Sequence, residues 1–103
     1  MKKLLPTIAL LMTLAPTAYA EDSKTMCKQV SAVAEQIMKA RQNGVDMSKL
    51  FELTEDNEAA QGMIILAYEQ PQYSSDKYQQ REVQKFKNGF YLACVKNKMG
   101  ATK

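Results

Sequence analysis

Residues 74–98 read SSDKYQQREVQKFKNGFYLACVKNK, and this stretch sets the architecture that we expect for the whole chain. Ser74, Ser75 and Asp76 are residue types that cap the N-terminus of a helix. Behind them, apolar residues recur at spacings of three and four, which places them on one helical face. These residues are Val83, Phe86, Phe90 and Cys94. The stretch therefore predicts one long helix with a cysteine on its apolar face.

Residues 1–20 have the pattern of a cleaved signal peptide. Two lysines near the start precede an apolar segment, and Ala18 and Ala20 have the small side chains of a cleavage site. The apolar segment is shorter than the roughly 20 residues that a membrane-spanning helix needs, although an uncleaved anchor stays open as an alternative. We expect cleavage after Ala20, a single helical domain over residues 21–103, and a location in the periplasm or outside the cell.

Cys27 is the only cysteine besides Cys94, and it lies on the apolar face of another helical pattern. Two cysteines in a short exported chain predict one disulfide in an oxidising compartment. Two free or redox-active thiols are the alternative, but the sequence has no C-x-x-C motif. A bond across so long a loop is expected to stabilise the fold by about 4 kcal/mol.

Three further helices are expected before the last one. The first runs from residue 22 or 23 to 43, and Gly44 is placed to end it in the left-handed conformation. The second is short, over residues 47–53, with Asp46 as its N-cap. The third covers residues 58–69, with Asp56 or Asn57 as its cap.

The third helix contains an unbroken apolar run at residues 63–67, which is typical of the buried centre of a bundle. Pro71 ends this helix. Gly89 weakens the last helix by about 1 kcal/mol relative to alanine, and either permits a close crossing with another helix or marks a kink. The pattern predicts an all-α fold of four helices, the second short, with the first and last joined by Cys27 and Cys94.

The charge is almost balanced once the signal peptide is removed, because the formal net charge of +3 then loses two lysines. This balance argues against nucleic acid as a partner. Acidic residues gather in residues 46–69 and basic residues in 76–103. The two segments are either solvated faces that attract each other within the fold, or the last helix presents a basic face to a membrane surface or an acidic protein. The candidate basic face consists of Lys77, Lys85, Lys87 and Lys96.

The residue types of most enzyme active sites are missing. The chain has no histidine, so it lacks Ser-His and Cys-His pairs and imidazole metal ligands. Disulfide-bonded cysteines leave no thiolate for zinc. The carboxylates between Glu52 and Glu58 straddle a helix break, where capping and solvation account for them. We therefore expect no catalytic activity, no metal and no cofactor.

An aromatic corner stands out where the third and last predicted helices meet. Tyr68, Tyr73 and Tyr78 gather there beside Pro71, and Arg81 follows one turn later. Tyrosine is enriched at protein interfaces because it combines a large contact area with one hydroxyl. The corner is either a partner-binding patch made of these three tyrosines and Arg81, or a structural closure of the bundle end.

Three segments carry a resemblance to a known group of proteins: IMKARQNG at residues 37–44, IILAYEQP at residues 64–71, and residues 86–94 with their late cysteine. They resemble short exported proteins of bacteria and phages that have an IM-x-x-RQ-x-G segment and an AY-x-x-P corner. The resemblance implies the architecture and no activity. In size, helicity and single disulfide the chain is also similar to periplasmic acid-stress chaperones.

Taken together, these features favour a small, non-enzymatic exported protein that binds another envelope or secreted protein. A periplasmic stress chaperone and a binder of anionic membrane surfaces are the alternatives.

Overall fold

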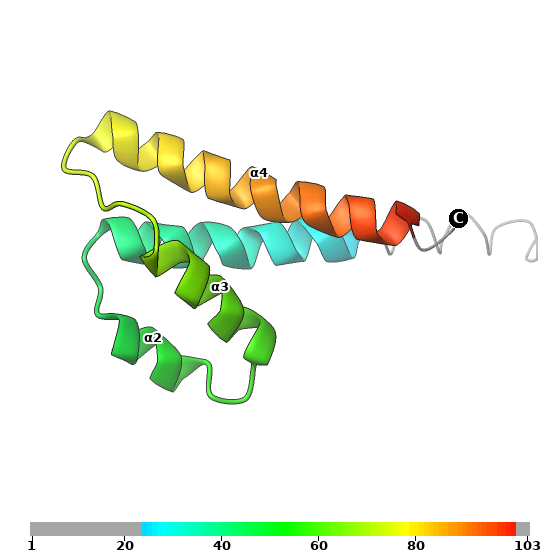
Figure 1. Cartoon of the computed structure of the whole chain (residues 1–103), viewed down its shortest axis with the longest axis horizontal. Coiled ribbons are helices and arrows are strands. Elements are labelled where there is room, and N and C mark those ends of the chain that lie inside the picture. The colour runs from blue at the N-terminus through cyan, green and yellow to red at the C-terminus, as the bar shows by residue number, and fades with distance from the viewer. Residues whose placement is uncertain (1–23, 101–103) are drawn as a thin grey trace, which may run out of the picture.

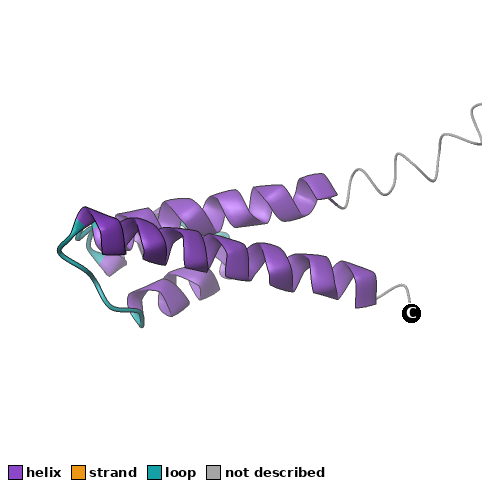
Figure 2. Cartoon of the chain, turned by 90° about the horizontal axis from the view of Figure 1, so that it is seen from above, coloured by secondary structure: helices purple, strands orange, loops and turns teal. Residues whose placement is uncertain are grey.

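The computed structural model describes residues 24–100, and the predicted signal peptide lies outside the described residues. Within this range the chain forms four helices and no strand (Figure 1, Figure 2). The N-terminal helix covers residues 24–42, and it is followed by α2 at Met47–Leu53, α3 at Glu58–Tyr68 and α4 at Asp76–Gly100. The prediction of an all-α fold with a short second helix is confirmed.

The two long helices lie side by side, and α2 and α3 form a hairpin that packs against them (Figure 1). Burial of apolar side chains where the hairpin meets the long helices holds these parts together. Ile64 of α3 and Met38 of the N-terminal helix are fully buried at this junction. The other core residues are Ala34, Ile37, Met63, Ala67 and Val83. Among the described helices, none has both the length and the apolar character needed to cross a membrane.

Local sequence signals account for most of the helix ends. Gly44 has a φ of +80°, as predicted, and the backbone N–H of Val45 reaches the carbonyl of Ala40 at 3.0 Å. This pattern satisfies the last carbonyls of the N-terminal helix. Asn57 caps α3 by accepting a hydrogen bond from the N–H of Ala60 at 3.0 Å. Asp46 stands at the N-cap position of α2, but its side chain makes no capping hydrogen bond.

The predicted disulfide is present between Cys27 and Cys94, whose Cα atoms lie 5.5 Å apart. It joins the N-terminal helix to α4, and no described cysteine is free. The bond lies in the half of the molecule where the long helices extend past α3 (Figure 1). Helix α3 does not flank the long helices there, so the covalent link adds to the packing of the two long helices on each other.

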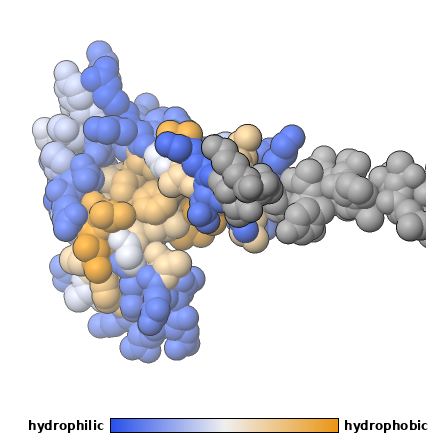
Figure 3. Space-filling model, turned by 45° about the vertical axis from the view of Figure 1, so that its right-hand side comes forward, coloured by the Kyte–Doolittle hydropathy of each residue, from blue (hydrophilic) through white to orange (hydrophobic). Residues whose placement is uncertain are grey.

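The prediction that the apolar run of α3 forms the buried centre of the bundle holds for one side of the helix only. Its inner face is buried, but Ile65 is 44% and Leu66 46% exposed. No other helix covers the outer side of α3, because a single hairpin packs on one side of the long pair (Figure 1). Apolar surface accordingly gathers in the middle of the face seen in Figure 3, with polar side chains above and below it.

Candidate functional site

The four residues of the predicted tyrosine corner, Tyr68, Tyr73, Tyr78 and Arg81, fall into two groups. Tyr68 is half-buried, and its hydroxyl donates a hydrogen bond to the carbonyl oxygen of Val45. The Arg41 guanidinium lies 5.1 Å from the centroid of its ring. Burial raises the pKa of the Tyr68 hydroxyl above its ordinary 10.0, although the positive charge of Arg41 acts to lower it. The hydroxyl therefore keeps its proton at neutral pH. Tyr68 thus ties α3 to the chain that follows the N-terminal helix.

The second group forms a small exposed cluster. The rings of Tyr73 and Tyr78 are 5.8 Å apart between centroids and tilted by 35°. The Arg81 guanidinium lies 5.5 Å from the centroid of the Tyr78 ring, a distance typical of a cation–π contact. Tyr78 is 47% exposed. We call Tyr73, Tyr78 and Arg81 the aromatic cluster, and it presents the exposed ring of Tyr78, the partly buried ring of Tyr73 and the cation of Arg81 to solvent.

The side chain of Gln42 fixes the backbone of the connection that carries Tyr73. Its side chain is 97% buried, donates to the carbonyl of Pro71 at 2.9 Å, and accepts from the N–H of Tyr73 at 2.8 Å. Gln79 adds a third link by donating to the carbonyl of Tyr73 at 2.6 Å. The connection between α3 and α4 is therefore fixed against the end of the N-terminal helix, so the cluster is pre-organised for contact.

Arg41 completes this attachment. Its Nε and Nη2 atoms donate to the carbonyl of Gln70 at 3.2 and 2.9 Å. The sequence pattern predicted no role for Arg41 and Gln42, which belong to the IM-x-x-RQ-x-G segment. A signal was present for Gln42, which follows Ala34 and Met38 at spacings of four and so places an amide on the buried face. The spacing of residues along one helix does not predict that Arg41 and Gln42 form hydrogen bonds to a segment about 30 residues later in the chain.

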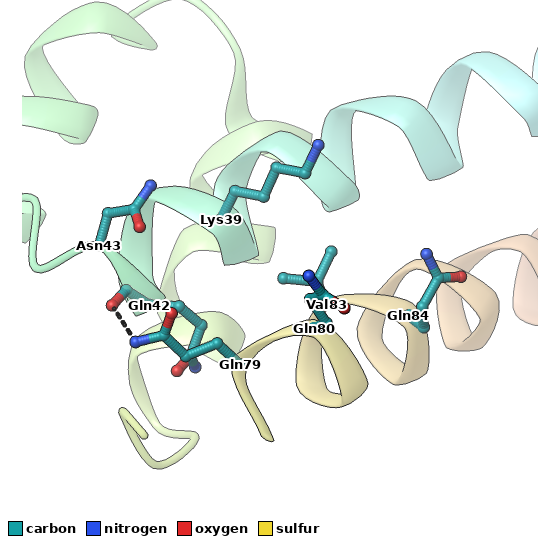
Figure 4. Close-up of a pocket in the computed structure, with 7 residues that line it drawn as sticks. All are labelled: Lys39, Gln42, Asn43, Gln79, Gln80, Val83 and Gln84. Atoms are coloured by element: carbon teal, nitrogen blue, oxygen red, sulfur yellow. Dashed lines mark hydrogen bonds between the residues drawn. The ribbon is translucent and has the colours of Figure 1, made fainter. Parts of the chain in front are cut away.

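A cleft of about 340 Å³ opens beside the aromatic cluster, between the N-terminal helix and α4 (Figure 4). Five amide side chains and Lys39 surround an apolar floor at Val83. The amide residues are Gln42, Asn43, Gln79, Gln80 and Gln84. Amides both donate and accept, so such a lining matches an uncharged polar segment such as a peptide backbone.

The candidate basic residues do not share one surface. Lys77, Lys85 and Lys96 are exposed along α4. Lys87 instead faces the N-terminal helix, where its Nζ lies 3.4 Å from a carboxylate oxygen of Glu35. Lys39 is bound to the other oxygen of the same carboxylate at 3.5 Å. Only three of the four lysines therefore remain on the open face.

This ion pair makes a pH-dependent contribution to the packing of the two long helices. Burial alone would raise the pKa of Glu35, but Lys87 and then Lys39 outweigh it and hold the pKa below the ordinary 4.5. The ionised carboxylate therefore stabilises the folded state above about pH 4.5, and this contribution is lost as the pH falls through the lowered pKa.

Glu35→Gln is expected to lower the melting temperature at neutral pH, and the difference from wild type should shrink below pH 4.5 and vanish in stronger acid. Thermal unfolding monitored by circular dichroism from pH 7 to pH 2 measures this difference. Glu55→Gln is the matched control, because Glu55 is exposed and has no ion pair to a described residue. A difference that stays constant over this range would contradict the assignment.

Among the described residues, no acidic residue of the hairpin forms an ion pair with a basic residue of α4. The ion pairs among the described residues both involve Glu35, which lies outside the acidic segment. No group of three or more described acidic or cysteine side chains is arranged to hold a metal ion. The hairpin and α4 therefore present opposite charges to the surroundings rather than to each other.

Comparisons of the chain with protein-family models, with curated proteins and with solved structures give no match. The resemblance drawn from the three sequence segments stays a prediction.

Proposed function

We propose that this protein is a small exported interaction module of the bacterial periplasm, which acts without catalysis and binds another protein through the aromatic cluster. The observation that carries the proposal is the fixed geometry of Tyr73, Tyr78 and Arg81 over a backbone held by the buried Gln42. Exposed tyrosine and arginine side chains dominate binding energies when their geometry is set before contact.

The amide-lined cleft next to the cluster supports the same proposal. Gln79 contributes to both features, since its amide donates to the carbonyl of Tyr73 and also lines the cleft. A partner segment that stacks on the tyrosines would place its backbone near unoccupied amides of Gln80 and Gln84. The disulfide suits the oxidising compartment in which we place this encounter.

Tyr78→Ala is expected to weaken partner binding by about 2 kcal/mol, which is roughly 30-fold in Kd. The test is a cross-linking pull-down from the envelope of the native host, with the tagged exported chain as bait. Wild type should capture one protein that Tyr78→Ala and Tyr73→Ala lose.

Tyr91→Ala is the matched control for this experiment, because Tyr91 lies on α4 outside the cluster. Circular dichroism spectra of all variants check that the fold is kept. Equal capture by wild type and by folded Tyr78→Ala would reject the cluster as the binding site. Capture of many unrelated proteins would favour a stress chaperone instead.

A second candidate function rests on the open face of α4. Lys77, Lys85 and Lys96 are exposed along this helix, and Leu92 is 58% exposed. Basic side chains attract anionic lipid headgroups, and an apolar side chain beside them can enter the interface. Sedimentation with vesicles of phosphatidylglycerol, but not of phosphatidylcholine, with release by salt would support this function.

A further inference from the structure

A groove of about 360 Å³ runs between α3 and α4. Leu66, Phe86 and Phe90 form its apolar walls. Gly89 and Ala93 lie between them and add almost no bulk, so a passing helix could approach the α4 backbone closely. A Cβ atom built on Gly89 meets no atom of another described segment within 4 Å, so packing within the described part of the chain does not require a glycine there. Helix α4 also continues through Gly89 without a break.

Glu82 supplies an independent observation at the same place. It lines the groove and is only 7% exposed. Its carboxylate has no hydrogen bond or ion pair to any described residue. The residue is largely covered, but its carboxylate oxygens still reach the solvent of the groove, because no fully buried side-chain oxygen among the described residues lacks a hydrogen bond. A cation that enters the groove can therefore pair with this carboxylate in a partly desolvated setting, where an ion pair is stronger than on the open surface.

The exposed side of α4 beside the groove carries such a cation at a matching position. Glu82, Gly89 and Lys96 follow one another at intervals of seven residues, which is close to two helical turns. Lys85 and Leu92 are also seven residues apart and lie on the same strip. We call this strip the α4 seam. Its centre is Gly89, with a carboxylate at one end and an amine at the other.

We propose that two copies of this protein associate through the α4 seam, with the two α4 helices antiparallel and crossing at Gly89. In this arrangement a residue n positions before Gly89 in one copy lies opposite the residue n positions after Gly89 in the other copy. Glu82 then meets Lys96 of the second copy, and Phe86 meets its Leu92. Two-fold symmetry produces each of these contacts twice.

The seam fits a second copy because it complements itself in both charge and shape. The unpartnered carboxylate of Glu82 and the exposed amine of Lys96 are equally distant from Gly89. Leu92, at 58% exposed, supplies an apolar side chain for a groove walled by Phe86 and Leu66. The close approach that Gly89 permits brings these groups within reach. This inference does not depend on the aromatic cluster.

The test is the molar mass of the exported, disulfide-bonded chain, measured by sedimentation equilibrium over a wide range of concentration. The expected result is a monomer–dimer equilibrium. Gly89→Gln should raise the dimer Kd at least tenfold, because the longer side chain keeps the helices apart, while its Cβ atom meets no described atom within 4 Å in the monomer. Gly62→Gln is the matched control, since Gly62 is another exposed helical glycine with open space around it, and it should leave the Kd unchanged.

A charge exchange tests the register. Lys96→Glu should weaken the dimer at least tenfold, and adding Glu82→Lys to the same chain should restore it, because the paired charges are then reversed in both copies. Glu82→Gln keeps the shape of the side chain and should weaken the dimer without the strain of a buried lysine.

Three outcomes would overturn the proposal. A chain that stays monomeric at every concentration would overturn it, and a basic helix of another protein would then be the better candidate for the groove. A dimer that persists in Gly89→Gln would place the interface elsewhere. A folded Glu82→Lys, Lys96→Glu chain that stays as weakly associated as Lys96→Glu alone would reject the antiparallel register.

Discussion

Cys94→Ser is expected to lower the melting temperature by about 15 °C or more. The disulfide closes a loop with a sequence separation of 67, for which the chain-entropy estimate is about 4 kcal/mol. In a domain of this size, each kcal/mol shifts the melting temperature by about 4–8 °C. The total stability of a small domain is on the order of 5–15 kcal/mol, so the bond accounts for a large part of it.

The effect should be concentrated at the disulfide end of the molecule. There the long helices extend past α3 (Figure 1). Met26, next to Cys27, is 46% exposed, and Leu92, close to Cys94, is 58% exposed. Hydrogen exchange should therefore rise first around Cys27 and Cys94 in the variant, and later in the core around Ile64.

Thermal unfolding by circular dichroism measures the shift, and alkylation of Cys27 verifies that its thiol has become free. Reduction of the wild-type chain and the double variant Cys27→Ser, Cys94→Ser should both reproduce the lower melting temperature. A melting curve that does not move in any of the three would show that packing alone holds the long helices together.

Gln42→Leu is expected to destabilise the fold by about 3 kcal/mol and to loosen the aromatic cluster. Leucine has a similar size and a good helix propensity, so the packing of the N-terminal helix is kept. The variant leaves the carbonyl of Pro71 and the N–H of Tyr73 without their side-chain partners. Each of these two hydrogen bonds lies at a partly buried site and is worth up to about 1.5 kcal/mol.

Urea unfolding measures the free-energy change, and near-ultraviolet circular dichroism reports the ordering of the tyrosine rings. Gln80→Leu is the matched control, because Gln80 lines the same cleft but is exposed and makes no side-chain hydrogen bond to a described residue. It should change stability by less than about 0.5 kcal/mol. Equal stabilities and equal tyrosine spectra of the two variants would contradict the role assigned to Gln42.

Much of the fold was predictable because helix signals are local. The bounds of α2, the left-handed Gly44 and the cap at Asn57 each depend on a few neighbouring residues. The pairing of Cys27 with Cys94 followed from the presence of two cysteines alone. The sequence predicted one tyrosine corner, and its division into Tyr68 and the aromatic cluster was not predicted.

The contacts that place the candidate site escaped prediction for a physical reason. Gln42 binds Pro71 and Tyr73 across 29 and 31 positions of the chain, and the direction of a side chain over such a distance depends on how helices cross. The same reason applies to Lys87, which turned toward Glu35 and away from the other lysines. It also applies to Leu66, whose exposure depends on which side of α3 the long helices occupy.

The amino-acid sequence by itself determined the helices, their ends and the covalent link, because these depend on periodicity, on capping residues and on the number of cysteines. Only the tertiary structure decided that a buried glutamine fixes the aromatic cluster, and that Glu82 lies unpartnered in an apolar groove. Both facts depend on packing between segments distant in the chain, where shape and burial select the partner of each polar group.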